Sequence, residues 1–427
     1  MTWQRTAERY MSTFEDARQR HRLKAFARSG KALPEPDNDA VPDMQIGYFL
    51  SMCDDTGLFQ HAVHSVPDRS HGYCVDDNAR ALLLACALDH PGEQRLPEVL
   101  TARFAAFVQH AWNPDTQRFR NFMGFNRTWL EDAGSEDSHG RTLWALGECA
   151  RSDCSPSRRR WAASLFAEAL PTAEAFASPR AWGFALLGLD AYCAAAPNDL
   201  RARDVRCVLA DRLMTIFAAV ETPGWVWFEA GLAYDNARLP QALMLTGMAT
   251  RTPAYVDAGL RSLHWLMTQQ TTPAGLFRPV GTAGFGERRQ HPRAFDQQPV
   301  EATATIAACL AAWRADGDTG WKAAASRAFE WFLGSNDLSL ALVDLHTGSC
   351  RDGLHPDRAN ENCGAESVVC YLLGRAEIRQ LAQVNTGLTK AAALRAVGAS
   401  VLPPTPASRG NLVTSPLPEP AGALSSA

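Results

Sequence analysis

The sequence SHGYCVDDNARALLLA, which spans Ser70–Ala85, passes without a break from a polar, aromatic turn into an apolar helix. Asp76, Asp77 and Asn78 stand at the changeover, and Arg80 follows one turn into the helix. Acidic and amide side chains are favoured at a helix start, because they accept hydrogen bonds from its free N–H groups and complement its dipole. This preference explains one of the two adjacent aspartates. Two consecutive acids, an asparagine and an arginine before an almost wholly apolar helix predict a buried helix whose start faces a polar cavity.

The same design occurs in five further places, where a short polar segment runs directly into an apolar helix. The six copies are spaced by roughly 40–65 residues, at the upper end of the range that is typical of helical arrays. In chain order the copies begin at Ser70, Ser135, Ala177, Tyr234, Asp296 and Glu361. Amphipathic helices of the ordinary surface type separate the copies. We expect these helices over residues 98–110, 157–169, 202–219, 255–269 and 321–333.

Because an apolar helix alternates with an amphipathic one through all six copies, we predict the inner and outer helices of a closed ring. The expected fold is all-α, an (α/α)6 toroid of six helical hairpins. Residues 1–42 are expected to form an N-terminal helix and a linker, and residues 43–383 the toroid. Residues 384–427 lack any period and are predicted to be disordered. The loops before the inner helices are long, so binding residues should gather on that face.

Composition excludes several classes of partner. The 427 residues carry a formal net charge of −4, so no basic surface indicates nucleic acid. No apolar run reaches the roughly 18 residues that a membrane helix needs. The N-terminal stretch also lacks the apolar segment of a secretory signal. The 11 cysteines are scattered without a C-x-x-C pair, which is typical of reduced thiols. We therefore expect a cytoplasmic protein.

Carboxyl groups and aromatic rings are expected to meet at the mouth of the ring, because both occur where the inner helices begin. Apolar faces of sugar rings pack on indoles, and a pair of carboxyl groups can act as general acid and general base on a glycosidic bond. The predicted catalytic residues are Asp77, Asp137, Asp235 and Glu301. The predicted substrate-binding residues are Tyr73, Asp76, Asn78, Arg80, Trp129, His139, Trp225, Trp227 and Asn236.

Several of these residues also have a structural interpretation. One of the two adjacent aspartates suits a helix cap. When the copies are aligned, Arg80, Arg141 and Arg238 fall in one column, which favours salt bridges between inner helices. Glu301 takes the place of arginine in a later copy, within an otherwise apolar helix. Because a buried unpaired carboxylate is costly, Glu301 is either paired with an arginine or has a raised pKa that suits an acid catalyst.

The sequence predicts neither a metal nor a cofactor. Its histidines do not occur at the H-x-x-x-H or H-x-E spacing of zinc sites, and no cluster of Cys and His is present. GTAGFGERR, residues Gly281–Arg289, is rich in glycine, but it lacks the preceding strand and following helix that a nucleotide loop needs.

The stretch HGYCVDDNARAL (His71–Leu82), with TGLFQHA (Thr56–Ala62) upstream, resembles a bacterial group within the six-hairpin glycosidase-like superfamily. That group occurs near, or fused behind, group-1 glycosyltransferases. WQRTAERYMSTFEDA (Trp3–Ala17) is similar to the closing helix of such a transferase domain. The resemblance implies a toroid that takes an oligosaccharide or glycan, with a glycosyltransferase as a partner. Adjacent aspartates also occur in α-mannanases of this architecture, which implies the same role for Asp76 and Asp77.

The expected activity is hydrolysis of a glycosidic bond by paired carboxyl groups at the mouth of the toroid. A sugar epimerase or isomerase on the same ring is the first alternative. It would need a histidine pair as acid and base, for which only His139 and His71 are placed. The second alternative is a non-catalytic glycan-binding module that supports a glycosyltransferase. A terpene-cyclase-like ring fits least, because many arginines and carboxylates accompany the aromatics.

Overall fold

The computed structural model describes residues 41–88 and 95–399. The chain divides into two compact units, residues 1–383 and 384–427, and the polar segments that begin the six copies all lie in the first. The N-terminal helix and linker expected over residues 1–42 lie outside the described residues, except for Val41 and Pro42. At the other end, the last helix runs to Ala399, beyond the boundary expected at residue 384. Residues 400–427 of the predicted tail lie outside the described chain.

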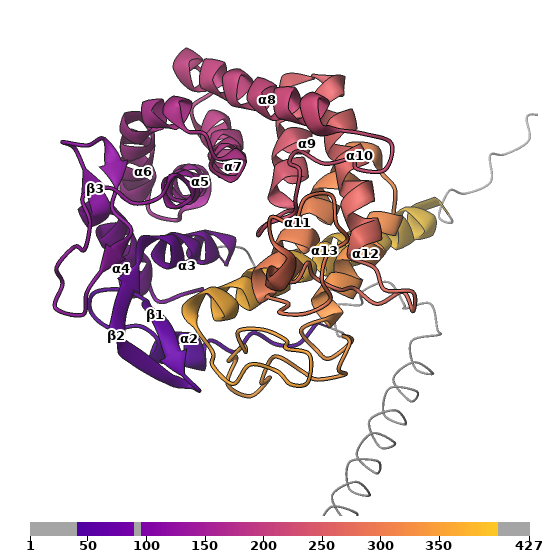
Figure 1. Ribbon diagram of the computed structural model, residues 1–427. Coiled ribbons are helices and arrows are strands. Elements are labelled where there is room, and N and C mark those ends of the chain that lie inside the picture. Colours follow the sequence, from indigo (N-terminus) through magenta and orange to yellow (C-terminus); the bar gives the residue numbers. More distant parts are fainter. Residues whose placement is uncertain (1–40, 89–94, 400–427) are drawn as a thin grey trace, which may run out of the picture. The chain divides into compact units, whose positions relative to one another are not determined.

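Each of the six recurring polar segments leads into one inner helix of a closed ring (Figure 1). The inner helices are α3 (Val75–Ala87), α5 (Glu136–Ser152), α7 (Pro179–Ala195), α9 (Arg238–Thr250), α11 (Pro299–Asp316) and α13 (Ala365–Ala399). From α3 to α11, each inner helix packs on the next. The Thr303 hydroxyl of α11 donates to the Cys370 carbonyl of α13, and Arg80 of α3 pairs with Glu366 of α13, which closes the ring. The predicted (α/α)6 toroid is confirmed.

Amphipathic helices surround this ring. Each packs against the inner helix that precedes it in the chain, so that helical hairpins stand side by side around the ring. These outer helices are α4 (Glu98–Ala111), α6 (Pro156–Ala169), α8 (Leu200–Val220), α10 (Pro253–Gln269) and α12 (Gly320–Glu330). A short helix, α2 (Gly47–Ser51), precedes the first inner helix. All of the predicted outer helices are confirmed, and their ends differ from the predicted ones by a few residues at most.

Local sequence determines where these helices start and how closely they approach one another. The side chains of Ser135, Ser178 and Asp199 accept backbone N–H bonds at the starts of α5, α7 and α8. Gly147 of α5 faces Gly188 of α7, and a Cβ atom at Gly147 would lie 2.2 Å from the Gly188 carbonyl oxygen. Only glycine permits this approach, so these two inner helices pack backbone against backbone.

A small antiparallel sheet stands beside the start of α3. Its strands, in spatial order, are β1 (Phe59–Val63), β2 (Val66–Cys74) and β5 (Phe122–Met123). A separate hairpin consists of β3 (Trp112–Asn113) and β4 (Arg118–Phe119). Two of the long segments that precede inner helices, those before α3 and α5, therefore contain short strands. Because Cys74 lies opposite Phe122, the loop between α4 and α5 is held against the first residues of α3.

The apolar core lies between the inner and outer layers of helices. For example, the ring of Phe166 in α6 stacks on Tyr192 in α7, with centroids 4.2 Å apart. Two short 3₁₀ helices, η2 (Leu170–Ala175) and η3 (Thr282–Gly284), lie in the connecting loops. Within residues 41–88 and 95–399, none of the helices combines the length and the apolar character that crossing a membrane requires.

Candidate active site

A cavity of about 570 Å³ opens where the inner helices α3, α5 and α13 begin. Strands β1 and β5 and the loops that precede α9, α11 and α13 complete its wall. Carboxyl groups dominate this wall. Those that line the cavity are Asp76, Asp77, Asp137, Asp296, Asp352 and Glu366. The arginine and histidine side chains on the same wall are Arg80, His61 and His355.

Arg80 is the centre of a group of three carboxyl groups. Its Nη1 atom lies 2.5 Å from an Asp76 oxygen and 3.1 Å from an Asp77 oxygen, and its Nη2 atom lies 2.7 Å from a Glu366 oxygen. One oxygen from each carboxyl group lies within 4.8 Å of the others. Since Arg80 is only 3% exposed, its charge acts through protein rather than through water.

The two adjacent aspartates have opposite pKa shifts. Burial opposes the ionisation of Asp76, but the charges of Arg141 and Arg80 outweigh it and lower the Asp76 pKa. Burial raises the pKa of Asp77 to about 8, and the attraction of Arg80 does not cancel that effect. Near neutral pH, Asp76 is therefore ionised while its neighbour Asp77 keeps its proton. One cavity thus holds a carboxylate and a carboxylic acid side by side.

A buried layer of ion pairs supports these aspartates from inside the ring. The Arg141 guanidinium bridges Asp76, at 2.7 Å, and Asp235, at 3.0 Å, and it stacks over the Phe184 ring at 4.0 Å. Asp235 also pairs with Arg238 at 3.3 Å. Two members of the arginine column therefore join segments of different inner helices, since Arg141 bridges Asp76 and Asp235 and Arg80 pairs with Glu366. Arg238 pairs with Asp235 of its own segment, so the structural interpretation is confirmed for Arg80 and Arg141.

Asp137 occupies another part of the cavity wall. One of its carboxylate oxygens accepts a hydrogen bond from the Ser178 hydroxyl at 2.5 Å, and the other accepts one from the Tyr234 hydroxyl. Tyr234 also lines the cavity. Since both oxygens already accept hydrogen bonds from neutral groups, Asp137 is suited to accept a further hydrogen bond from a ligand hydroxyl.

No family model matches the chain, and no curated protein matches it. Several solved structures do match the chain. A cellobiose 2-epimerase from Bacillus thermoamylovorans aligns with a TM-score of 0.63 and 9% identity, over 81% of this chain and 97% of its own. A D-mannose isomerase aligns with a TM-score of 0.61 and 12% identity, over 79% of this chain and 94% of its own. The chain has the six-hairpin glycosidase fold.

An α-1,6-mannanase of Salegentibacter has the same six-hairpin fold. It was solved as an inactive variant, with two consecutive aspartates replaced by alanine, in complex with α-1,6-mannotetrose. It aligns with a TM-score of 0.53 and 11% identity, over 78% of this chain and 96% of its own. At identities this low the likeness establishes the fold of the ring and leaves its chemistry to the site.

On this six-hairpin ring, Asp76, Asp77, Arg80 and Asp137 line the cavity, as predicted. Asp235, Asn236 and Glu301 do not line it, and none of the three has any exposed surface. The Asn236 amide donates to Glu301 at 3.0 Å, and burial raises the Glu301 pKa to about 8. The prediction that these three residues contact substrate is corrected, because they lie within the ring, screened from the cavity.

The predicted tryptophan platform is wrong. Trp225 and Trp227 are 5% and 0% exposed, and their rings pack on Trp265 of the outer helix α10, with centroids 4.8 and 5.8 Å away. Their alternation around a valine resembled a strand with one solvent-facing side, but the loop folds both indoles into the core. Trp129 does not line the cavity either, because its ring packs edge-on against His110.

Three other predicted binding residues are structural, and none lines the cavity. His139 is fully buried; its Nε2 donates to the Ala169 carbonyl at 3.1 Å while Nδ1 accepts the Phe119 N–H, and burial lowers its pKa to about 3. The Tyr73 hydroxyl donates to Asp54 at 2.6 Å. The Asn78 side chain accepts the Leu58 N–H and donates to the Cys74 carbonyl, which anchors the start of α3.

Sequence reasoning missed Asn121 and its neighbour Phe122. The Asn121 side-chain oxygen accepts bonds from the Ser138 hydroxyl, at 2.8 Å, and from the Asp76 backbone N–H, at 3.3 Å. It thereby ties β5 to the starts of α3 and α5. The alternating phenylalanines of this stretch were visible in the sequence, but nothing there showed which of them faces the cavity.

His61 and His355 were also missed. They come from β1 and from the loop before α13, which are far apart in the sequence, and they line the same cavity. The His355 ring lies 3.4 Å from an Asp296 oxygen. The histidines that we had proposed for this place differ: His139 is in the core, and His71 is exposed beside Asp68.

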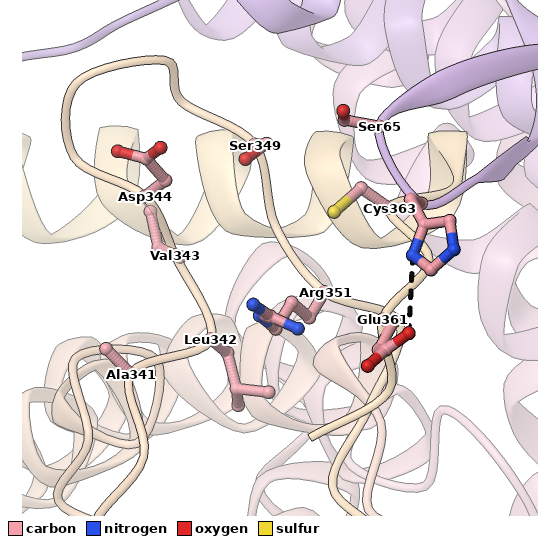
Figure 2. Close-up of a pocket in the computed structure, with 10 residues that line it drawn as sticks. Ser65, Ala341, Leu342, Val343, Asp344, Ser349, Arg351, Glu361 and Cys363 are labelled. Carbon is pink, nitrogen blue, oxygen red and sulfur yellow. Dashed lines mark ion pairs between the residues drawn. The ribbon is translucent and has the colours of Figure 1, made fainter. Parts of the chain in front are cut away.

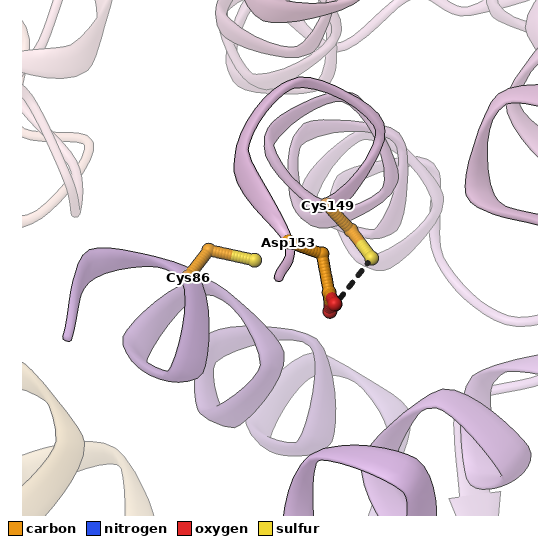
Figure 3. A group of neighbouring side chains, drawn as sticks. All are labelled: Cys86, Cys149 and Asp153. Carbon is orange, nitrogen blue, oxygen red and sulfur yellow. Dashed lines mark hydrogen bonds between the residues drawn. The ribbon is translucent and has the colours of Figure 1, made fainter. Parts of the chain in front are cut away.

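Two groups of three side chains have metal-ligand spacing in the described part of the chain. One is Asp76, Asp77 and Glu366, which already surround Arg80. The other is Cys86, Cys149 and Asp153, at the C-terminal ends of α3 and α5 (Figure 3). There Arg158 pairs with Asp153 at 2.7 Å. Because a guanidinium contacts each group, a cation would be repelled, and the prediction of no metal stays unchanged.

A second cavity, of about 510 Å³, lies outside the carboxyl site (Figure 2). The turn between β1 and β2 and the loop between α12 and α13 enclose it. His64 and Glu361 form an ion pair of 3.3 Å on its wall. Asp77, whose pKa burial raises to about 8, lines the first cavity and not this one, so the first cavity is the candidate active site.

Proposed function

We propose that the chain is a glycoside hydrolase in which Asp77 is the general acid and Asp76 is its ionised partner. The single observation that carries this proposal is the pair of adjacent carboxyl groups in one cavity whose pKa values are shifted apart. Such a pair supplies an acid and a carboxylate at the same pH, which is the requirement of glycosidic bond cleavage. Asp76, which the sequence analysis placed among the substrate-binding residues, thus becomes the partner of Asp77 in this proposal.

The proposed reaction has two steps. The Asp77 carboxylic acid gives its proton to the glycosidic oxygen as the bond to the anomeric carbon breaks, and the Asp76 carboxylate attacks that carbon. Ionised Asp77 then takes a proton from water, whose oxygen displaces Asp76 and frees the sugar. One oxygen of each group lies within 4.8 Å of one oxygen of the other, which is below the 6.5–9.5 Å of inverting enzymes and fits the closer spacing, about 5–5.5 Å, of retaining ones better. The sugar should therefore keep its anomeric configuration.

The Salegentibacter mannanase supports this assignment as an analogy. Its inactive variant lacks two consecutive aspartates, and the consecutive aspartates of this chain lie at the mouth of the same kind of ring. The ring neighbours also include sugar epimerases and isomerases, so the fold alone does not select the reaction. A glycosyltransferase partner and a cytoplasmic location stay predictions.

Activity is expected to fall as the pH rises through about 8. Asp77 acts only when protonated, and its pKa is about 8, so above that value kcat/KM should decrease about tenfold per pH unit. The lowered pKa of Asp76 keeps its carboxylate ionised across this range. A pH profile of kcat/KM checks the expectation. Glu301→Gln is the matched control, because it removes a carboxyl group with the same raised pKa from outside the cavity and should leave the profile unchanged. A profile that stays flat through this pH contradicts the role of Asp77.

His61 and His355 favour a second candidate function, a sugar epimerase or isomerase, because both imidazoles line the carboxyl cavity. Such an enzyme moves a proton at the carbon beside a carbonyl group and needs an acid and a base there. Incubation with reducing oligosaccharides in deuterium oxide separates the two reactions. A hydrolase releases shorter sugars, whereas an epimerase or isomerase places deuterium on the sugar and leaves the chain length unchanged. Loss of deuterium incorporation in His355→Asn would then replace the hydrolase proposal.

The experiment that tests the proposed function directly is a release assay on manno-, gluco- and galacto-oligosaccharides. Wild type and Asp77→Asn are compared side by side, with the products separated by chromatography. Release by the wild type alone supports the hydrolase. If neither protein releases or isomerises sugar, while oligosaccharide raises the melting temperature of both, the chain is a glycan-binding module instead.

A further inference from the structure

Phe122 is an apolar side chain displayed on the wall of the carboxyl cavity, where it is 38% exposed. Its backbone cannot easily move away. The Phe122 N–H donates to a Glu131 carboxylate oxygen at 2.6 Å, its carbonyl accepts the Leu130 N–H at 3.0 Å, and the residue pairs with Cys74 across the sheet. The backbone of Phe122 is therefore held by three contacts, while the residue lines the cavity and stays partly exposed.

A water-exposed aromatic ring in a cavity favours a ligand that covers it. The C–H face of a pyranose does so, because it removes apolar surface from water on both partners. Phe122 and Tyr234 are the only Phe, Tyr or Trp residues on this cavity wall within the described chain, and the Tyr234 hydroxyl is held by Asp137. Phe122 thus takes the place that we had predicted for the buried Trp225 and Trp227.

The position of Phe122 relative to the carboxyl pair indicates which sugar it would contact. Its neighbour Asn121 accepts the Asp76 backbone N–H at 3.3 Å and lines the cavity as well. Asn121 therefore joins the segment that carries Phe122 to the first turn of α3, where Asp76 and Asp77 lie. A sugar on Phe122 would be a neighbour in the chain of the sugar whose bond is broken.

The charge of the wall restricts that sugar further. Six carboxyl groups line the cavity, together with one arginine and two histidines. Among the described residues, neither Asp137 nor Asp352 forms an ion pair with Lys or Arg. Asp137 accepts hydrogen bonds from two hydroxyl groups, and Asp352 accepts one from the Gly364 N–H. A uronate or a phosphorylated sugar would meet these negative charges without a free cation to balance them, which is unfavourable.

We propose that Phe122 is the binding platform for a second, uncharged sugar unit, so that the substrate is a neutral oligosaccharide of at least two pyranoses. This inference rests on the proposed function, whose site it extends by one sugar. It assigns the stacking contact to a phenylalanine and the exclusion of acidic sugars to the surrounding carboxylates.

The test measures binding to the Asp77→Asn protein by calorimetry, so that no probe is consumed. Gluco-, manno- and galacto-tetraoses are the neutral probes, and the tetramer of galacturonate is the acidic probe. Adding Phe122→Ala should weaken binding of the best neutral tetraose by about tenfold, leave the matching monosaccharide unaffected, and be rescued by Phe122→Trp. Phe125→Ala is the matched control, because Phe125 is 47% exposed and does not line the cavity; it should change nothing.

The outcomes separate this inference from the proposed function. Equal binding by the Phe122→Ala and Phe125→Ala proteins overturns the platform, even if the wild type releases sugar. Binding of the galacturonate tetramer as tight as that of the neutral tetraoses overturns the charge argument. If the wild type neither binds nor cleaves any of the probes, the proposed function itself fails, and the platform fails with it.

Discussion

Replacing Asp77 by asparagine is expected to lower kcat by about 10²–10⁴-fold, because removal of a general acid forfeits a contribution of that size. Asparagine has nearly the shape of the carboxylic acid that burial favours at this position, where the pKa is about 8. It can still accept the hydrogen bond from Arg80, which lies 3.1 Å from an Asp77 oxygen. The fold and the affinity for the oligosaccharide should therefore survive while proton donation is lost. Steady-state kinetics with the best substrate of the release assay measure the effect.

The control for this prediction is Glu301→Gln. Burial raises the Glu301 pKa to about 8 as well, and asparagine and glutamine replace the two acids in the same isosteric way. Glu301 has no exposed surface and does not line the cavity, so kcat should stay unchanged. If kcat fell equally in the two variants, the loss would come from removing a buried carboxylic acid and not from losing proton donation to the substrate. An activity that survives in Asp77→Asn would remove Asp77 from the reaction.

Arg141→Met should lower the free energy of unfolding by about 3–5 kcal/mol, the usual cost of breaking a buried ion pair from one side. The guanidinium is 2% exposed and pairs with both Asp76 and Asp235. Methionine fills much of the space over the Phe184 ring, so the loss of charge rather than of volume dominates. Asp235 would keep only Arg238, at 3.3 Å, and would remain in a fully buried place. Urea denaturation followed by circular dichroism measures the change.

Arg127→Met provides the contrast for Arg141→Met. Arg127 forms an ion pair with Asp55, but the side chains are 59% and 73% exposed, so water and salt screen the pair and stability should hardly change. Arg141→Met has a second expected consequence. Since the charge of Arg141 helps to lower the Asp76 pKa, its loss should move the acidic limb of the activity profile to higher pH. Equal stability of the two variants would contradict the structural role of the arginine column.

The hydrophobic pattern was enough to predict the ring. Each inner helix is buried on almost all sides, and each outer helix is buried on one side. The two kinds of helix therefore have different patterns of apolar residues, which are visible within each helical segment of the sequence. The α11 segment illustrates the first state, since 14 of its residues, from Pro299 to Ala312, are buried. The starts of α5 and α7 also have a local cause, because Ser135 and Ser178 cap their own first turns. The cap that we expected from Asp76 or Asp77 is absent, since Cys74 is the residue before α3 and neither aspartate caps it.

The cavity-lining carboxyl groups nearest to a helix start could be predicted for the same local reason. Asp76, Asp77 and Asp137 lie in the first turns of α3 and α5, so their direction follows from the helix itself. The sequence of a loop does not indicate the direction of its side chains in this way. Trp225 and Trp227 are buried in the core, whereas Phe122 is partly exposed and lines the cavity, although all three occupy similar aromatic, polar stretches. Which side of a loop faces inward depends on the elements packed against it, and these come from distant parts of the chain.

The amino-acid sequence by itself determined the alternation of buried and half-buried helices, their number and the acidic starts that face one side of the ring. These properties depend on contacts within a turn or within a hairpin. Only the tertiary structure decided that Arg141 stands beside Asp76 and helps to lower its pKa, while burial raises the pKa of Asp77. It also decided that His61 and His355 meet in one cavity. A pKa reflects every charge and every loss of water within a few ångströms, and ring closure brings the charges beside Asp76 and Asp77 together from α3, α5 and α13.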